Sequence, residues 1–107
     1  MAVTYFVRMA AKEGEADRVL ELLLCNPRRI EAGEPGNIVF AVHRSRVHPA
    51  EFWLYETWEN EDAANAHEIG EAFKEYRRAI GPLVDPESVV FGNTEPIKVI
   101  GYSADSG

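Results

Sequence analysis

Glu56 and His67 fall at positions where a strand and the helix after it would bring their side chains together. On a strand over residues 52–59, alternation puts Glu56 and Trp58 on one face. On the following helix, Ala63 and His67 share a face. If that face packs on the strand, we expect His67 to meet Glu56 beneath Trp58. A carboxylate beside an imidazole fixes its tautomer, which suits a general base near neutral pH.

The same residues also fit a structural role. A Glu–His pair can be a buried hydrogen bond that joins a helix to a strand. Trp58 can be a core aromatic as readily as a platform for a flat substrate. The sequence leaves both alternatives open.

His43 and Arg44 are neighbours on a second strand and so point to opposite faces. An inward Arg44 would steady an anionic oxygen, whereas an inward His43 would move a proton. Placement of both at an exposed or interfacial edge fits equally well.

Several aromatic residues could line a pocket for a flat substrate. Their spacing makes them core residues first, and only a cavity between sheet and helices would give them a binding role. They are Tyr5, Phe40, Phe73, Tyr76 and Phe91.

The sequence indicates no resident cofactor or metal. It has no glycine-rich phosphate loop and no dinucleotide-binding fingerprint. His43, His48 and His67 lack the spacing of a metal cluster. No Ser–His–Asp or Cys–His arrangement is readable either.

The apolar pattern predicts one domain over residues 1–107, built from strands and helices in the order β-α-β-β-α-β. Strands are expected over residues 3–9, 38–45, 52–59 and 88–92, with a further strand over 97–102. A helix from residue 16 should end at Asn26-Pro27, and a short helix over 28–32 could use Asn26 as its cap. Asn60 should cap a long helix that Gly70 divides and that ends before Gly81.

This order is the split βαβ pattern of α+β, ferredoxin-like folds with an antiparallel sheet. Helices would cover one face of that sheet only, although apolar residues occur on both faces of the strands. A second copy of the chain would cover the other face, so we expect a homodimer. The extension over residues 93–107 would leave the domain and could pack on the partner subunit.

The composition weighs against nucleic-acid and membrane partners. The chain of 107 residues carries 11 Lys and Arg against 18 Asp and Glu, a net charge of −7, without a basic stripe. The single cysteine, Cys25, allows no internal disulfide. No apolar run approaches the ~20 residues of a membrane span, and the start of the chain has no basic leader, so we expect a cytoplasmic protein.

The segment from Phe52 to His67 resembles the characteristic segment of the antibiotic biosynthesis monooxygenase family. It is a strand with an aromatic-Glu-x-Trp core over residues 55–58, an acidic turn over 59–62, and an alanine-rich helix ending in histidine. The Glu-Pro-Gly turn at residues 34–36 is also similar to the family's turn into its second strand.

The resemblance implies a dimeric α+β barrel whose pocket lies between the sheet and the helices of each chain. The family includes cofactor-independent monooxygenases that convert phenols or quinols into quinones, and some of them carry a pocket histidine near His43. It also includes haem-degrading members, which use an Asn on strand one, a Trp on the helix after strand three and a later His. Here residues 3–9 contain no Asn and the other two positions hold His67 and, approximately, Arg77. The resemblance therefore disfavours haem degradation.

The sequence thus predicts a cofactor-independent monooxygenase for a small phenolic or quinol-type aromatic substrate. We expect His67, Glu56 and His43 to be catalytic. We expect six residues to bind substrate: Trp58, Arg44, Tyr5, Phe40, Phe73 and Tyr76. The alternatives are an oxygen-independent isomerase or lyase on the same scaffold and a non-catalytic dimeric binding or stress-response module.

Overall fold

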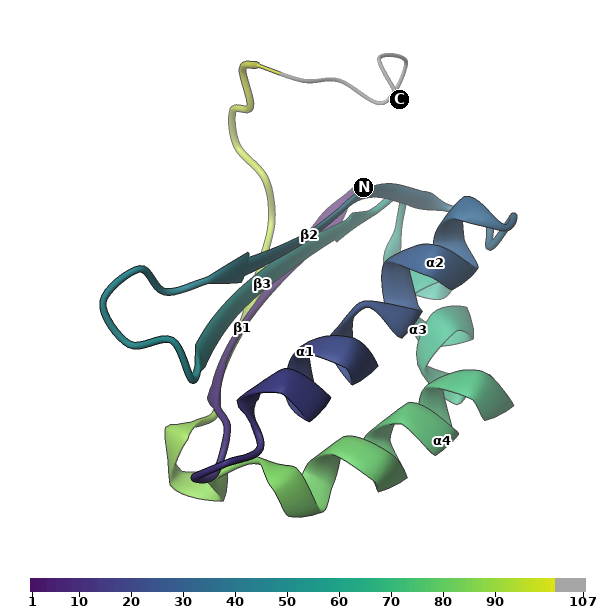
Figure 1. Cartoon of the computed structure of the whole chain (residues 1–107). Helices are drawn as coiled ribbons and strands as arrows, with labels where there is room; N and C mark the ends of the chain where they lie inside the picture. The colour runs from purple at the N-terminus through teal and green to yellow at the C-terminus, as the bar shows by residue number, and fades with distance from the viewer. Residues whose placement is uncertain (102–107) are drawn as a thin grey trace.

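The computed structural model describes residues 1–101 and has a four-stranded sheet with its helices on one face (Figure 1). The four strands are β1 (Val3–Ala10), β2 (Asn37–Arg44), β3 (Glu51–Trp58) and β4 (Val90–Thr94). The helices are α1 (Ala16–Leu23), α2 (Cys25–Glu31), α3 (Glu61–Ile69) and α4 (Glu71–Ile80). Two short 3₁₀ turns, η1 (Gly81–Leu83) and η2 (Pro86–Ser88), lead into β4.

The sheet has the order β2-β3-β1-β4, and every neighbouring pair is antiparallel. β1 therefore lies inside the sheet, between β3 and β4, and β2 and β4 form the two edges. This is the arrangement of the predicted ferredoxin-like fold, which is confirmed. In the register of β1 and β3, Tyr5 lies opposite Glu56.

Strand alternation divides the side chains between a covered face and an open face. On β1, Tyr5 and Met9 point to the helices and are buried, whereas Phe6 is half exposed on the other face. The main core lies between the sheet and the helices. Its fully buried members, with no exposed surface, include Val19, Leu23 and Phe52.

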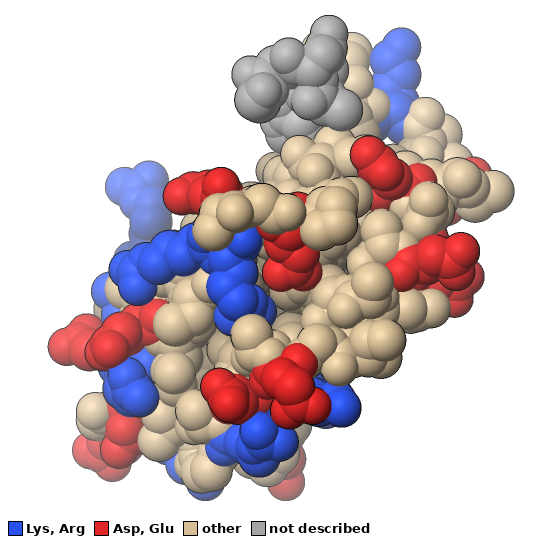
Figure 2. Space-filling view, turned by 90° about the vertical axis from the view of Figure 1, so that its right-hand side faces the viewer, with Lys and Arg blue, Asp and Glu red and all other residues tan. Residues whose placement is uncertain are grey.

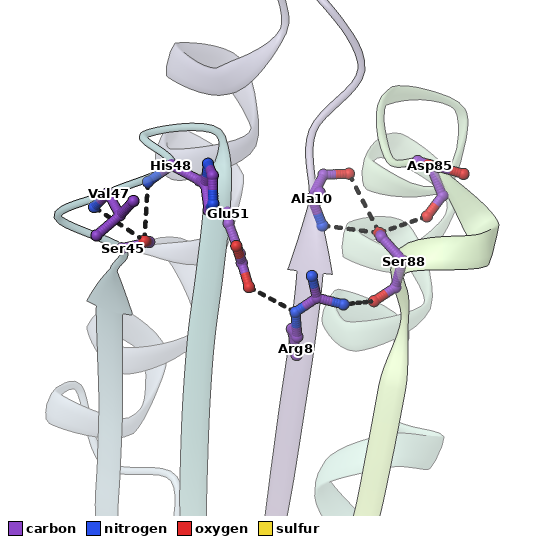
Figure 3. Close-up of polar contacts among 8 residues, drawn as sticks. All are labelled: Arg8, Ala10, Ser45, Val47, His48, Glu51, Asp85 and Ser88. Carbon is purple, nitrogen blue, oxygen red and sulfur yellow. Dashed lines mark hydrogen bonds and ion pairs between the residues drawn. The ribbon is translucent and has the colours of Figure 1, made fainter.

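Polar contacts tie β1 to β3 and to η2, the turn that precedes β4 (Figure 3). The Arg8 guanidinium donates from Nε to Glu51 at 2.5 Å and from Nη1 to the Ser88 carbonyl at 3.0 Å. The Ser88 hydroxyl in turn accepts from the Ala10 amide at 2.8 Å. These bonds fix the end of the sheet where η2 enters β4.

The helix boundaries follow local chemistry. The Asn60 side chain accepts from the Ala63 amide at 2.8 Å and caps α3, as predicted. Gly70 is extended, with φ −65° and ψ 147°, so it divides α3 from α4, and α4 ends before Gly81. These predictions are confirmed.

Two predictions about the helices and strands were wrong. Asn26 is not a cap but lies inside α2, because Leu24 stays in the helical region and forms the junction between α1 and α2. Pro27 fits there because the first turn of a helix leaves its amides unbonded. The fifth strand is absent over residues 97–101, which leave the body of the domain without pairing (Figure 1). Tyr102 lies outside the described residues.

Charges of both signs are interspersed on the face that carries α3 and α4 (Figure 2). No helix within residues 1–101 is long and apolar enough to cross a membrane.

Candidate functional site

A cavity of about 520 Å³ lies between the covered face of the sheet and the helices. Its wall is mostly apolar, which is typical of a site for a small organic ligand. The apolar lining residues include Leu54, Phe40, Phe73, Ile80, Val84 and Phe91. The polar lining residues are Glu56, Asn26, Tyr76, Glu68 and Arg77.

Glu56 presents a carboxyl group to this cavity from the middle of the sheet. Its Oε1 accepts a hydrogen bond from Nε1 of the fully buried Trp58 at 3.1 Å. Burial raises the pKa of Glu56 to about 7, and the negative charges of Glu68 and Glu34 act in the same direction, whereas the bond from Trp58 opposes the rise. The carboxyl can therefore exchange a proton near neutral pH.

Tyr76 reaches the same cavity from α4. Its hydroxyl is hydrogen bonded to the Asn26 side chain. Burial, together with the nearby Glu56 charge, raises its pKa well above the usual value, so the phenol stays neutral. Asn26 is itself fixed, because its Oδ1 accepts from Arg29 at 2.5 Å. Glu56, Tyr76 and Asn26 thus form the polar part of an otherwise apolar wall.

The mouth of the cavity is marked by its exposed lining residues. Glu68 at the end of α3 and Arg77 on α4 are both exposed, and so is Phe91 on the edge strand β4. Charged side chains at the mouth and the half-buried carboxyl of Glu56 inside give the site a polar entrance and a polar anchor.

His67 does not line the cavity, although it is only 4% exposed. Its ring lies 4.8 Å from those of Trp58 and Phe73 and 6.3 Å from Phe40. Within residues 1–101, His67 Nε2 is the only buried side-chain nitrogen or oxygen that lacks a hydrogen-bond partner. These aromatic rings separate His67 from the cavity.

The predicted pairing of His67 with Glu56 is wrong. His67 Nδ1 donates instead to Glu34, from the turn before β2, while the Glu56 carboxyl is held by Trp58. The reason is the depth of α3: it packs so closely on that turn that a Cβ on Gly36 would lie 2.6 Å from Ala63 Cβ. Glu34 in this turn, rather than Glu56 on the strand, is therefore the hydrogen-bond partner of His67.

His43 and Arg44 lie away from this cavity. His43 is on the open face, where its ring stacks on Tyr55 with centroids 5.8 Å apart. It lines a second hollow, of about 360 Å³, together with Phe6 and Trp53. Arg44 is on the covered side but at the far end of β2, where its Nε donates to the Pro49 carbonyl at 2.8 Å and its guanidinium lies over Phe52.

The predicted aromatic residues divide into two groups. Phe40, Phe73 and Tyr76 line the cavity, and so does Phe91. Tyr5 and Trp58 are buried beside it in a small cluster with Ala64.

Sequence reasoning missed Glu34, Asn26 and Glu68. The Glu-Pro-Gly turn was visible, but no periodicity links a turn residue to a histidine 33 positions later. Asn26 was interpreted as a cap because it precedes a proline. Glu68 follows His67 directly, and the helical period could have placed it at the edge of the same face. Within the described residues, no group of three His, Cys, Asp or Glu side chains is arranged to hold a metal ion.

Solved structures share this fold along almost the whole chain. A candidate antibiotic biosynthesis monooxygenase from Nitrosomonas europaea superposes with a TM-score of 0.82 at 21% identity, covering 94% of each chain. One from Chloroflexus aurantiacus gives 0.79 at 18% identity, covering 94% of this chain and 98% of its own. A protein from Mycobacterium tuberculosis gives 0.83 at 18% identity, covering 94% and 100%. Among curated proteins, none matches the sequence.

The sequence profile of the family described as antibiotic biosynthesis monooxygenase matches residues 2–79. The match includes β1 to β3, α3 and most of α4, and therefore most of the elements that build the cavity. The chain belongs to the antibiotic biosynthesis monooxygenase family.

Proposed function

We propose that this protein is a cofactor-independent monooxygenase that oxidises a small phenolic or quinol-type ring with molecular oxygen. The observation that carries the proposal is the cavity itself: a mostly apolar space of about 520 Å³ with the carboxyl of Glu56, whose pKa is about 7, in its inner wall. Membership of the family and the likeness to candidate monooxygenases support the same reaction class.

The reaction balances without a further reductant. A base removes the phenolic proton, and the phenolate passes one electron to oxygen to give a phenoxyl radical and superoxide. These combine at a ring carbon to form a peroxide. Loss of the hydrogen on that carbon as a proton, with cleavage of the O–O bond, gives a quinone and water. The protein supplies orientation, proton transfer and exclusion of water from the radical pair.

Three aromatic residues are placed to hold the ring. Phe40 from β2 and Phe73 and Tyr76 from α4 line the cavity on its sheet and helix sides. Tyr5 and Trp58 support them from the adjoining cluster. Among the three candidate catalytic residues, Glu56 faces the cavity, whereas His67 acts from behind Trp58. His43 lies on the open face and would need a second copy of the chain to take part. Arg44 is held at the far end of β2, outside the cavity lining.

Oxygen consumption tests this function. The purified, metal-stripped protein is incubated with a panel of hydroquinones in an oxygen-electrode cell, and quinone is followed by its absorbance. Uptake of one oxygen molecule per hydroxylated quinone formed, without release of hydrogen peroxide, supports the proposal. A complete panel without uptake above that of heat-denatured protein would contradict it.

An oxygen-independent isomerase or lyase is the second candidate. A carboxyl with a pKa of about 7 suits a proton shuttle on a carbonyl-bearing metabolite. Turnover that persists under argon would favour this candidate over the monooxygenase. A non-catalytic module would be favoured by a filled interior, but Phe73, Tyr76 and Phe91 line an open cavity, which weighs against it.

We also propose a homodimer formed through the open face of the sheet. This face exposes Phe6 at 49% and Trp53 at 50%, and the second hollow lies between them. The extension beyond β4 carries Ile97, Val99 and Ile100, all exposed, and would pack on the partner subunit. Light scattering at micromolar concentration should give about twice the chain mass of 12.0 kDa, and a monomeric mass would contradict the dimer.

A further inference from the structure

Glu56 is the acidic group best placed to contact a ring bound within the cavity. Its carboxyl lines the wall, and Oε1 is anchored by the Trp58 indole at 3.1 Å. The other lining carboxylate, Glu68, is exposed at the mouth. No ion pair with Glu56 occurs within residues 1–101 among those closer than 4.0 Å. Its acceptor capacity is therefore not taken up by a cation.

The groups around Glu56 favour a hydroxyl as its ligand. Tyr76 faces it from α4 and is hydrogen bonded to Asn26, so a neutral polar pair lies beside the carboxyl. Glu68 from α3 and Glu34 from the turn before β2 add negative charge nearby. Arg77 also lines the cavity, but it is exposed at the mouth. Beside Glu56 a carboxylate ligand would be repelled, whereas an uncharged hydroxyl can donate to Glu56 without adding charge.

His67 adjoins the site through neighbouring aromatic rings, and among these Trp58 is the one that holds Glu56. One nitrogen of its ring is held by Glu34, and the ring lies 4.8 Å from that of Trp58, tilted by 35°. The Trp58 indole in turn holds Glu56. The contact chain from Glu34 through His67 and Trp58 to Glu56 fixes the carboxyl from behind.

We propose that the cavity binds an uncharged, hydroxyl-bearing aromatic ring whose hydroxyl donates to Glu56, that Glu56 is the group that accepts its proton, and that His67 is a positioning residue acting through Trp58. This inference rests on the proposed function for the reaction and the phenolic substrate class, and it deepens it by naming the base, the group that binds the hydroxyl and the role of His67. The proton moves from the ring oxygen to a carboxylate oxygen of Glu56, and no electron moves in this step.

Binding of 2-naphthol and its methyl ether, 2-methoxynaphthalene, tests the proposal by calorimetry without any turnover. At pH 8 naphthol is neutral and Glu56 is ionised, so wild type should prefer naphthol about tenfold or more, the equivalent of one hydrogen bond to a charged group. The preference should fall between pH 8 and pH 6 as Glu56 takes up a proton.

Glu56→Gln should lose most of this preference and its pH dependence, because an amide is a weaker acceptor and does not ionise. The matched control is Glu75→Gln on α4, which makes the same chemical change at an exposed position outside the cavity. Glu75→Gln should retain the preference for naphthol and its pH dependence. Absence of naphthol binding to wild type, or a preference with unchanged pH dependence in folded Glu56→Gln, would overturn the assignment of Glu56.

The role of His67 has its own readout. In a Trp53→Phe background the emission of Trp58 alone is recorded for His67→Gln and for the milder Glu34→Gln. A positioning role predicts a shifted Trp58 emission and a weaker naphthol preference, with the fall between pH 8 and pH 6 retained. Loss of that pH dependence in folded His67→Gln would show that His67 is the titrating base and contradict the proposal.

The proposed monooxygenase function and the proposed hydroxyl site at Glu56 can fail separately. Correct binding behaviour without oxygen uptake would remove the monooxygenase function and leave the hydroxyl site intact. Oxygen uptake with unaltered naphthol preference in Glu56→Gln would retain the function and remove Glu56 as the base.

Discussion

The indole of Trp58 donates to the carboxyl of Glu56, two residues earlier on the same strand and the same face, at 3.1 Å. A fully buried aromatic thus anchors an ionisable group that lines the cavity. The same tryptophan lies against His67. Glu56, Trp58 and His67 therefore form one cluster of side chains in contact. Only Glu56 among them contacts the ligand space.

Replacement of Trp58 should destabilise the fold and disturb Glu56 together. Trp58→Phe removes the donor to a half-buried carboxyl and part of a fully buried ring, which should lower the free energy of unfolding by about 2–3 kcal/mol. Urea denaturation at pH 7 measures the change. Trp53→Phe is the matched control, since Trp53 lies outside the core on the open face and phenylalanine keeps an aromatic ring there, and it should change the value by less than about 1 kcal/mol. Equal losses in both variants would contradict the anchoring role.

The pH dependence of stability should report the unusual pKa of Glu56. That pKa is about 7 in the folded protein, above the ~4.3 of an unfolded glutamate. Between these values the unfolded state binds fewer protons, so the contribution of Glu56 to stability falls as pH rises. The loss is complete above about pH 7 and reaches at most about 4 kcal/mol.

Glu56→Gln removes this penalty. The variant should therefore match wild type within about 1 kcal/mol at pH 5 and exceed it by about 1–3 kcal/mol at pH 8. Glu75→Gln, at an exposed site on α4, should show no such divergence. A difference between wild type and Glu56→Gln that is the same at pH 5 and pH 8 would show that Glu56 titrates normally.

The close approach of α3 to the turn before β2 is testable at Gly36. Its φ is +85°, and an added Cβ would lie 2.6 Å from Ala63 Cβ. Gly36→Ala should lower the free energy of unfolding by about 2–4 kcal/mol, from backbone strain and the clash together. Gly14→Ala is the control, because Gly14 has φ +81° but nothing within 4 Å of the added carbon.

The contribution of the clash can be isolated with a second change. Adding Ala63→Gly to Gly36→Ala removes the opposing methyl group and should recover part of the loss, beyond what additivity of the single changes gives. Full additivity would show that α3 does not pack on the turn as described.

Much of the fold could be predicted from the sequence because it depends on local patterns. Alternation in β1 and β3, the Asn60 cap and the break at Gly70 are all set by residues close in sequence. The pairing of His67 could not be predicted in this way. It depends on how deeply α3 settles against a distant glycine turn, and the sequence period gives only the face of the helix.

The residues of the candidate site also divide into those that local patterns predict and those whose positions depend on packing. Glu56 and Phe73 were identifiable from strand and helix periodicity, and both line the cavity. Asn26 was not, because its helical position follows from the junction at Leu24 rather than from the proline beside it. The position of His43 on the open face also required the actual register of β2 against β3, including the irregularity between Asn37 and Val39.

The most direct test of the account is oxygen consumption by the metal-stripped protein with hydroquinones, for wild type and Glu56→Gln in parallel from pH 6 to pH 9. If Glu56 is the base, uptake by wild type should rise with pH around 7. The rate in folded Glu56→Gln should be about 10²-fold or more lower, which is the usual contribution of a general base. Uptake that is equal in the two proteins across this range would contradict the assignment of the chemistry to the cavity carboxyl.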